Sequence, residues 1–280
     1  LLMAQRIRRR EINKEIDHEQ AVLWLIKLCL ELCGTYSHDP FNPRMGTIQY
    51  KVEPFMQISE LRRLLDKPGT EQGLSLAREA AALAYDLSGS PQESFIGPAL
   101  FYKGSYGGLG ICDFKANEPL DLTSEERASI NYRIITPDFT LVNCHSVVEY
   151  LGKDHEQGNN PEIDHVRSLD YQTLGIREFG FDYEDVKSRS DFMQSAARVV
   201  AAVEQHVGPK VRQQFLKLAS DKGFIERQRK LFEIFRPWLR NLSARPNEGP
   251  ATQAPVGSGK EHKPTDRTQV DGKERPKLTD

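Results

Sequence analysis

The residues from Pro137 to Leu151 constrain the fold of this chain more than any other stretch. They read PDFTLVNCHSVVEYL, two short runs of β-branched, aromatic and aliphatic residues joined by a polar turn at 143–145. Asp138 opens the first run, and Glu149 lies near the end of the second. Side chains two residues apart on a strand share one face of a sheet. The pattern therefore predicts a β-hairpin in which Asp138 and Glu149 lie at neighbouring strand ends.

The two acids are candidate metal ligands. A carboxylate within an otherwise apolar strand needs a compensating partner, such as a metal ion or a basic side chain. Carboxylate and carbonyl oxygens are the ligands that Mg²⁺ and Mn²⁺ prefer. We therefore expect Asp138 and Glu149 to hold one divalent cation, with the backbone carbonyl of Tyr150 as a further ligand. The alternative is a hairpin whose end carries two solvated acids.

Further motifs accompany the hairpin between residues 90 and 181. They are Ser90-Pro91-Gln92-Glu93, the glycine-rich run 107–110, Gly152 with His155, Asp164 with Arg167, and Leu174-Gly175-Ile176. Together with Pro137-Asp138 and Glu149-Tyr150, these motifs resemble the PD-(D/E)XK nuclease superfamily. The similarity is to the branch related to very-short-patch-repair endonucleases, which includes uncharacterised actinobacterial proteins related to abortive-infection regulators.

The resemblance implies a fold and a function. The implied fold is α/β with a restriction-endonuclease-like core, which is a mixed sheet flanked by helices. The elements of this core follow one another as helix, three strands, helix, strand and helix. The function is metal-dependent cleavage of DNA phosphodiester bonds with bound Mg²⁺ or Mn²⁺. Leu151, however, stands where this branch usually has Asp and where the wider superfamily has its lysine. A catalytically degenerate DNA-binding or regulatory module of abortive-infection type is therefore the alternative, and an interaction domain without a nucleic-acid partner is a third reading.

Other residues join this candidate site through the resemblance. Glu93 would be a third carboxylate near the metal, or a first-turn glutamate favoured by the helix dipole. His155 would be a catalytic general base or orient a water molecule, or is a loop histidine without a task. Lys153 would replace the missing lysine, or is solvated. Arg167 would contact a phosphate, or pair on the helix surface with Asp164.

Patterning divides the chain into four segments. Residues 1–88 form an N-terminal helical segment, and residues 89–208 form the endonuclease-like core. Residues 209–242 read as basic, amphipathic C-terminal helices. Residues 243–280 are rich in Pro, Gly, Thr and charge without apolar anchors, which predicts disorder.

Periodicity and capping residues predict the individual elements. Prolines limit regular structure between 35 and 56, and the glycines at 104–110 indicate a loop that lacks the Lys-Ser/Thr of a phosphate cradle. The expected helices cover 14–33, Ser59 to Leu65, Thr70 to about Leu87, a helix starting at Ser90, 162–174, and Ser190 to Gly208. The expected strands cover 111–115, 139–142, 146–151 and 176–181, with the last two joined by a right-handed crossover.

The C-terminal helical segment carries the basic charge expected of a DNA contact. Nine Lys or Arg residues face three acids between Pro209 and Arg240. We expect weak binding to duplex DNA without strong sequence preference. The alternative is that its aromatic residues pack on the core while its cations face water. The candidate DNA-contacting residues are Arg167, Lys210, Arg212, Arg227, Arg229 and Lys230, and the aromatic residues are Phe215, Phe224, Phe232, Phe235 and Trp238.

Composition narrows the class of protein further. A net charge of -2 gives no overall electrostatic preference for nucleic acid, and no apolar run is long enough for a membrane span or a secretory signal. Four cysteines without CxxC spacing predict no disulfide framework and a cytoplasmic setting. Cys29 and Cys33 share a helix face, and core burial explains them better than zinc. The sequence leaves open the oligomeric state, the DNA target and whether the N-terminus is complete.

Overall fold

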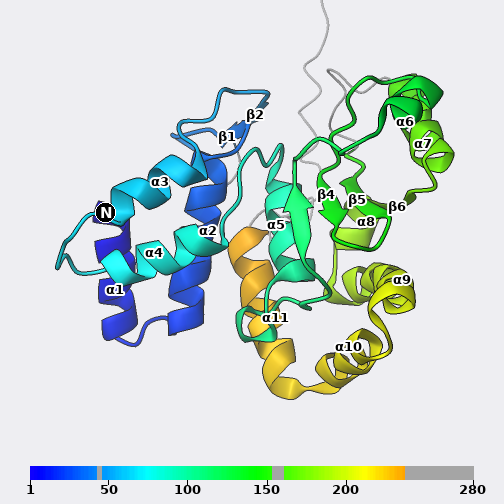
Figure 1. Ribbon diagram of the computed structural model, residues 1–280. Coiled ribbons are helices and arrows are strands. Elements are labelled where there is room, and N and C mark those ends of the chain that lie inside the picture. Colours follow the sequence, from blue (N-terminus) through cyan, green and yellow to red (C-terminus); the bar gives the residue numbers. More distant parts are fainter. Residues whose placement is uncertain (43–45, 153–160, 237–280) are drawn as a thin grey trace, which may run out of the picture. The chain divides into compact units, whose positions relative to one another are not determined.

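The computed structural model describes residues 1–42, 46–152 and 161–236, without the side chains of 161–164. These residues all belong to one compact unit. They form an α/β protein with a four-stranded mixed sheet and a separate two-stranded sheet (Figure 1). None of the described helices is long and apolar enough to cross a bilayer. Lys153, His155, Trp238 and the predicted disordered tail lie outside the described residues.

The four-stranded sheet contains the predicted hairpin. Its strand order is β3-β4-β5-β6, antiparallel except for the last pair, which is parallel. Phe139 lies opposite Val148, and Val148 lies opposite Phe179. Helix α7 connects the parallel strands, as the sequence predicts. The bounds are β3 Phe114–Ala116, β4 Phe139–Leu141, β5 Ser146–Tyr150, α7 Pro161–Thr173 and β6 Arg177–Phe181.

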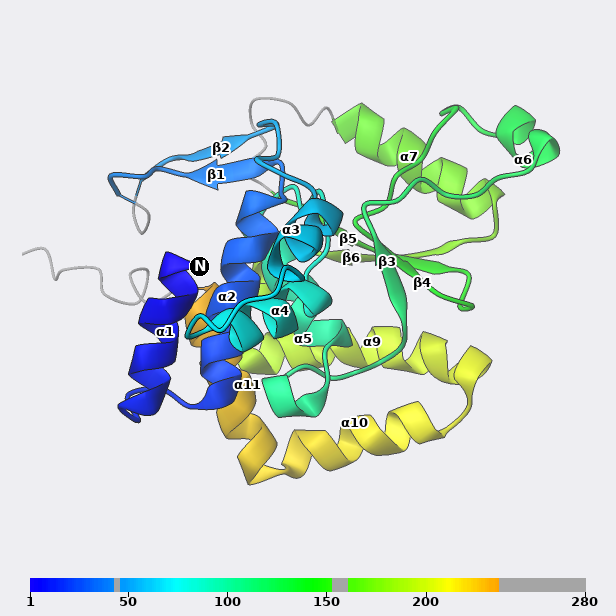
Figure 2. The ribbon, with the colours of Figure 1, turned by 60° about the vertical axis from the view of Figure 1, so that its left-hand side comes forward.

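Helices cover both faces of this sheet. Figure 2 shows α7 on one side and α5 (Pro91–Phe101) with α9 (Arg189–Val207) on the other. Strand alternation explains the two sides, because Val148 packs in the main core while Val147 packs with Tyr171 of α7. The face towards α5 is therefore the larger apolar face.

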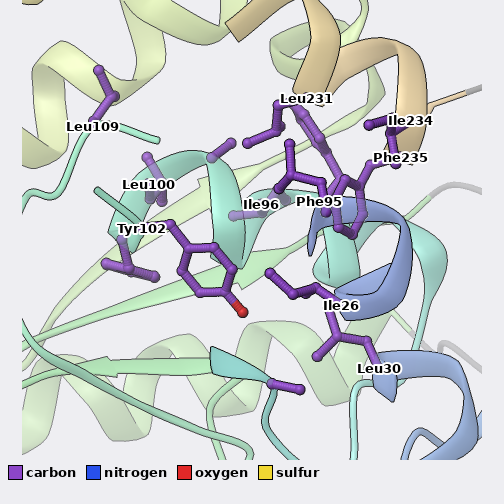
Figure 3. Close-up of a cluster of buried hydrophobic side chains, with 14 of the residues drawn as sticks. Ile26, Leu30, Phe95, Ile96, Leu100, Tyr102, Leu109, Leu231, Ile234 and Phe235 are labelled. Atoms are coloured by element: carbon purple, nitrogen blue, oxygen red, sulfur yellow. The ribbon is translucent and has the colours of Figure 1, made fainter. Parts of the chain in front are cut away.

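Helix α5 is buried around almost its whole circumference. It starts as the sequence predicts, with the Ser90 side chain accepting the Glu93 N–H and Pro91 in the first turn. Every α5 residue except Gln92 is buried. Figure 3 shows side chains of α5 meeting those of α2 (His18–Leu32) and α11 (Lys222–Phe235) in one apolar cluster.

The N-terminal segment differs from its prediction in its boundaries. The helix expected from residue 14 starts at His18, because Asp17 and Gln20 form a capping box there. Residues 35–56 are not wholly irregular, since two short strands pair within them. Ser59 lies inside its helix, whose N-cap is Gln57, and the helix expected from Thr70 starts after Gly73. The remaining elements are α1 Leu2–Ile12, β1 Tyr36–His38, β2 Ile48–Tyr50, α3 Ile58–Leu65 and α4 Leu74–Leu83.

The C-terminal helices follow the prediction more closely. Helix α9 ends at Gly208 as expected, but its N-cap is Ser188 rather than Ser190, because the Ser188 hydroxyl accepts the Asp191 N–H. The basic segment forms two helices. A short helix before β4 has no counterpart in the expected elements. The bounds are α6 Ser124–Ser129, α8 Tyr183–Val186 and α10 Lys210–Ser220.

The loop predicted from the glycines at 104–110 packs against α11. It contains the short 3₁₀ helix η1 (Gly104–Tyr106), and the carbonyl of Gly104 accepts the Arg227 Nε–H at 2.8 Å. Gly107 has a φ of +84°, and a Cβ there would lie 2.7 Å from the Arg227 carbonyl oxygen. Only glycine fits this left-handed position so close to another backbone.

Gly107→Ala should destabilise the protein by at least about 3 kcal/mol, from left-handed strain and from contact with a helix backbone that cannot move aside. Gly175→Ala is the matched control, since Gly175 has a φ of +66° with nothing within 4 Å of an added Cβ. The control should cost only about 1 kcal/mol. Urea denaturation measures both, and equal losses would contradict the close packing of this loop on α11.

Candidate functional site

Asp138 and Glu149 come together at the end of the hairpin. Asp138 directly precedes β4, so the register that pairs Phe139 with Val148 continues to Asp138 beside Glu149. The Asp138 N–H donates to Glu149 Oε2 at 3.4 Å, and the Tyr150 N–H donates to Asp138 Oδ2 at 2.7 Å. The hairpin backbone therefore orients both carboxyl groups.

Helix α7 supplies the immediate partners of Glu149. Glu149 is 0% exposed. The Tyr171 hydroxyl donates to its Oε1 at 2.5 Å, and Arg167 Nη2 lies 3.7 Å from its Oε2. Arg167 and Tyr171 are four residues apart and so share one helix face. Tyr171 is absent from the sequence-based candidates, although its helical spacing from Arg167 is a signal that points to it.

Hydrogen bonds to Asp170 connect α7 with the segment that leads into β4. Its carboxylate accepts the N–H groups of Asn131 and Tyr132 at 2.9 and 3.0 Å. Burial of Asp170 opposes its ionisation, but these hydrogen bonds outweigh burial and hold its pKa below the usual value. Asp170 therefore positions the helix that carries Arg167 and Tyr171 against the strand that carries Asp138.

Glu93 lies close enough to this pair to influence it electrostatically. Its carboxylate accepts the Gly89 N–H at 2.6 Å. Burial raises the pKa of Glu93 to about 7, the charge of Glu149 also raises it, and the hydrogen bonds from Gly89 and Ser90 oppose the shift. Across the described ranges, no three or more His, Cys, Asp and Glu residues are placed to hold one metal ion. Glu93 lies in the capped first turn of α5, and its proposed role as a third metal ligand stays a prediction.

The acids hold their protons unusually tightly. Burial raises the pKa of Glu149 to about 8, the Asp138 charge raises it further, and Arg167 opposes the shift. Burial and the Glu93 charge likewise raise the pKa of Asp138 well above its usual value. Among the described side chains, Arg167 is the guanidinium that opposes the pKa shifts of all three carboxyl groups, so their ionisation leaves a deficit of positive charge among these residues. A divalent cation fits this deficit, and the donor oxygens suit Mg²⁺ or Mn²⁺.

Leu151 supplies no polar group in place of the Asp or Lys that the resembled proteins have at this position. Its N–H donates to the Phe181 carbonyl at 2.7 Å, which extends the pairing of β5 with β6. A Cβ at Gly180 would lie 2.5 Å from Leu151 Cδ1, so the leucine side chain lies over that glycine. Position 151 thus contributes an apolar side chain, and Arg167 supplies a positive charge from α7.

The candidate DNA-contacting cations of α10 and α11 mostly have partners within the protein. Lys210 is exposed, whereas four others contact protein oxygens. The paired cations are Arg212 with Glu204 (3.3 Å), Arg227 with the Gly104 carbonyl (2.8 Å), Arg229 with Glu226 (2.6 Å) and Glu233, and Lys230 with Asp17 (2.5 Å). These contacts compete with contacts to phosphate.

The aromatic residues and cysteines pack in the core. Phe224 and Phe235 are buried, and Phe215 and Phe232 pack against the core. The alternative interpretation of these four aromatics is therefore confirmed. Cys29 and Cys33 are also buried, as expected.

The side chain of Asp164 is outside the described residues, so its predicted pairing with Arg167 is not described.

Comparison with known proteins does not identify a relative. No protein-family model matches the chain, and neither curated proteins nor solved structures show a significant similarity to it. Function is therefore inferred from the residues of the site themselves.

The buried carboxyl groups should make stability depend on pH. The folded-state pKa of Glu149 is raised. Its contribution to the free energy of unfolding is therefore fully present below about pH 4.5 and is lost as the pH rises through about 8. The free energy of unfolding of the wild type should fall across this range. In Glu149→Gln the fall should be smaller by an amount on the order of a few kcal/mol.

Urea denaturation at several pH values measures this difference. Glu60→Gln is the control, because Glu60 is an exposed glutamate of α3, and it should follow the wild-type curve. Parallel curves for the wild type and Glu149→Gln would show that Glu149 is ionised at neutral pH in the folded protein.

Proposed function

We propose that this protein is a metal-dependent DNA endonuclease that uses Mg²⁺ or Mn²⁺, with Asp138 and Glu149 as the metal ligands. The main support is the pair of adjoining carboxyl groups with raised pKa values at the ends of β4 and β5. Buried acids with a deficit of positive charge are typical of functional sites.

The order of elements supports a restriction-endonuclease-like core for this proposal. Helix α5 is followed by the three strands β3 to β5, then by α7, β6 and α9. Short helices are inserted before β4 and after β6. This order is the one that the motif resemblance implies, with the acidic pair at the predicted hairpin.

The residues of the proposed site have separate roles in the proposed reaction. A bound metal would activate a water molecule and neutralise charge on the phosphate. The Tyr150 N–H orients Asp138, and the Tyr171 hydroxyl orients Glu149. The Arg167 side chain is 29% exposed, so it can reach a substrate phosphate from its place beside Glu149. His155 remains the proposed general base.

Incubation of supercoiled plasmid DNA with the protein and Mg²⁺ or Mn²⁺ tests the activity. We expect nicked or linear product from the wild type. Glu149→Ala and Asp138→Asn should each lower the rate at least roughly 100-fold, because each change removes a ligand of the charge-stabilising metal. Glu60→Gln should keep the wild-type rate.

A metal-binding measurement separates an inactive protein from a wrong site. Mg²⁺ should raise the melting temperature of the wild type, and more so as the pH rises towards 8, because protons compete with the metal. Glu149→Ala should lose this increase. An equal increase in both proteins would contradict the assignment of the metal ligands.

A degenerate DNA-binding or regulatory module is the second candidate function. The apolar packing of Leu151 over Gly180 favours it, because it leaves no polar group at that position. Such a protein would bind DNA without cleaving it, through the exposed cations of its basic helices.

Salt dependence tests DNA binding in either case. If about four cations meet phosphates, log K should fall with log salt at a slope of roughly −3.6. Lys210→Gln should reduce the slope to about −2.7, since one phosphate contact is lost. Arg229→Gln is the control, because Arg229 is held by Glu226 and Glu233. A flat dependence would favour an interaction domain without a nucleic-acid partner.

A further inference from the structure

Arg236, directly after α11, is a buried cation that has no anionic partner among the described side chains. Its residue exposure is 3%, and neither Nε nor Nη2 has a hydrogen-bond partner. No carboxylate among the described side chains forms an ion pair with it. A charge removed from water normally requires a counter-ion together with hydrogen bonds to the charged group.

Aromatic rings hold the guanidinium in place. Its Cζ lies 5.1 Å from the centre of the Phe95 ring and 5.2 Å from the centre of the Phe232 ring. These cation–π contacts offset part of the cost of burial. The ring contacts do not replace hydrogen bonds, because Nε and Nη2 still have no acceptor.

The two unpartnered nitrogens share one edge of the guanidinium. Nε and Nη2 form the edge that faces away from Cδ, and their hydrogens point in parallel. This edge matches two oxygens of one carboxylate or phosphate group, which arginine binds in a bidentate manner. An unpaired lysine ammonium would carry no such preference.

Two tyrosines that influence Arg236 electrostatically lie where the parallel strands end. Tyr150 ends β5 opposite Phe181, and Tyr183 begins α8 two residues after β6 ends. Burial lowers the pKa of Arg236 to about 10, and the phenols of Tyr150 and Tyr183 oppose this shift. In α/β sheets, ligands commonly bind beyond the carboxyl ends of parallel strands.

A second unpaired polar group lies one helical turn from Phe95. Gln92 Oε1 is buried without a hydrogen-bond partner, and Gln92 shares a face of α5 with Phe95 through its i,i+3 spacing. Gln92 thus offers an acceptor on the same helix face that contacts Arg236.

We propose that Arg236 binds an oxyanion, either a phosphate group or a carboxylate, at the carboxyl ends of β5 and β6. Tyr150 and Glu149 are consecutive on β5 and point to opposite faces, so this site is separate from the acidic pair. It therefore does not require the nuclease proposal to hold. Both nitrogens are covered in the present structure, so the oxyanion enters by local movement of the groups that cover them.

Thermal unfolding of the full chain with inorganic phosphate or acetate tests this site, with sodium chloride at equal ionic strength as the reference. At roughly 100 times its Kd, the bound anion should raise the wild-type melting temperature by about 5 °C or more. Arg236→Met removes the charge, and Arg236→Lys keeps it without the bidentate edge. Both should weaken binding at least about 10-fold.

Arg229→Met is the matched control, because Arg229 lies on α11, the helix that Arg236 directly follows, and already has carboxylate partners. It should respond to the anion as the wild type does. A larger response to phosphate than to acetate identifies a phosphate-type ligand, and the reverse identifies a carboxylate. No response of the wild type beyond that to chloride, or an undiminished response in Arg236→Met, overturns the proposal.

The Arg236 variants could unfold, so a measurement on the wild type is also needed. The arginine Nε–H signals in NMR spectra report directly on the binding edge. One such signal should shift in a saturable manner with phosphate or acetate and not with chloride. Absence of any saturable shift would overturn the proposal without reference to a variant.

Discussion

The burial of helix α5 is the constraint on which the rest of the structure depends. Its Phe95, Ile96 and Leu100 side chains join α2 and α11 into one core (Figure 3). The opposite face carries Gly97, where a Cβ would come within 2.3 Å of the Tyr85 hydroxyl oxygen. The same helix also supplies Glu93 to the acidic cluster and Phe95 to Arg236, so both proposed sites depend on its position.

Desolvation decides the chemistry of the acidic cluster. Glu149 is fully buried under α7, and it shares this environment with Asp138 and Glu93. Among the described side chains, the guanidinium of Arg167 alone does not neutralise three carboxylates, so burial and mutual repulsion raise their pKa values. If the proposed metal binds, it competes with protons for these carboxyl groups, which would link the pH dependence of stability to metal binding.

Alternation along β5 directs its last two side chains towards groups of opposite charge. Glu149 faces α7, while the neighbouring Tyr150 faces the core side near Arg236. Three carboxyl groups lie near the positive charge of Arg167 at the acidic site, whereas Arg236 has no ion pair with a described carboxylate. The Tyr150 N–H also holds Asp138, so a change at either site can reach the other through one residue of β5.

The sequence by itself determined the features that depend on neighbouring residues. The hairpin with its two acids, the start of α5 at Ser90-Pro91 and the end of α9 at Gly208 follow from alternation, capping and glycine, which act within a few residues. Only the tertiary structure decided which groups lose water and which cations find partners. The burial of Arg236, the contact of Tyr171 with Glu149 and the pairing of Lys230 with Asp17 join residues far apart in the chain. No local pattern encodes such contacts, because their free energy arises only when the separate elements pack together.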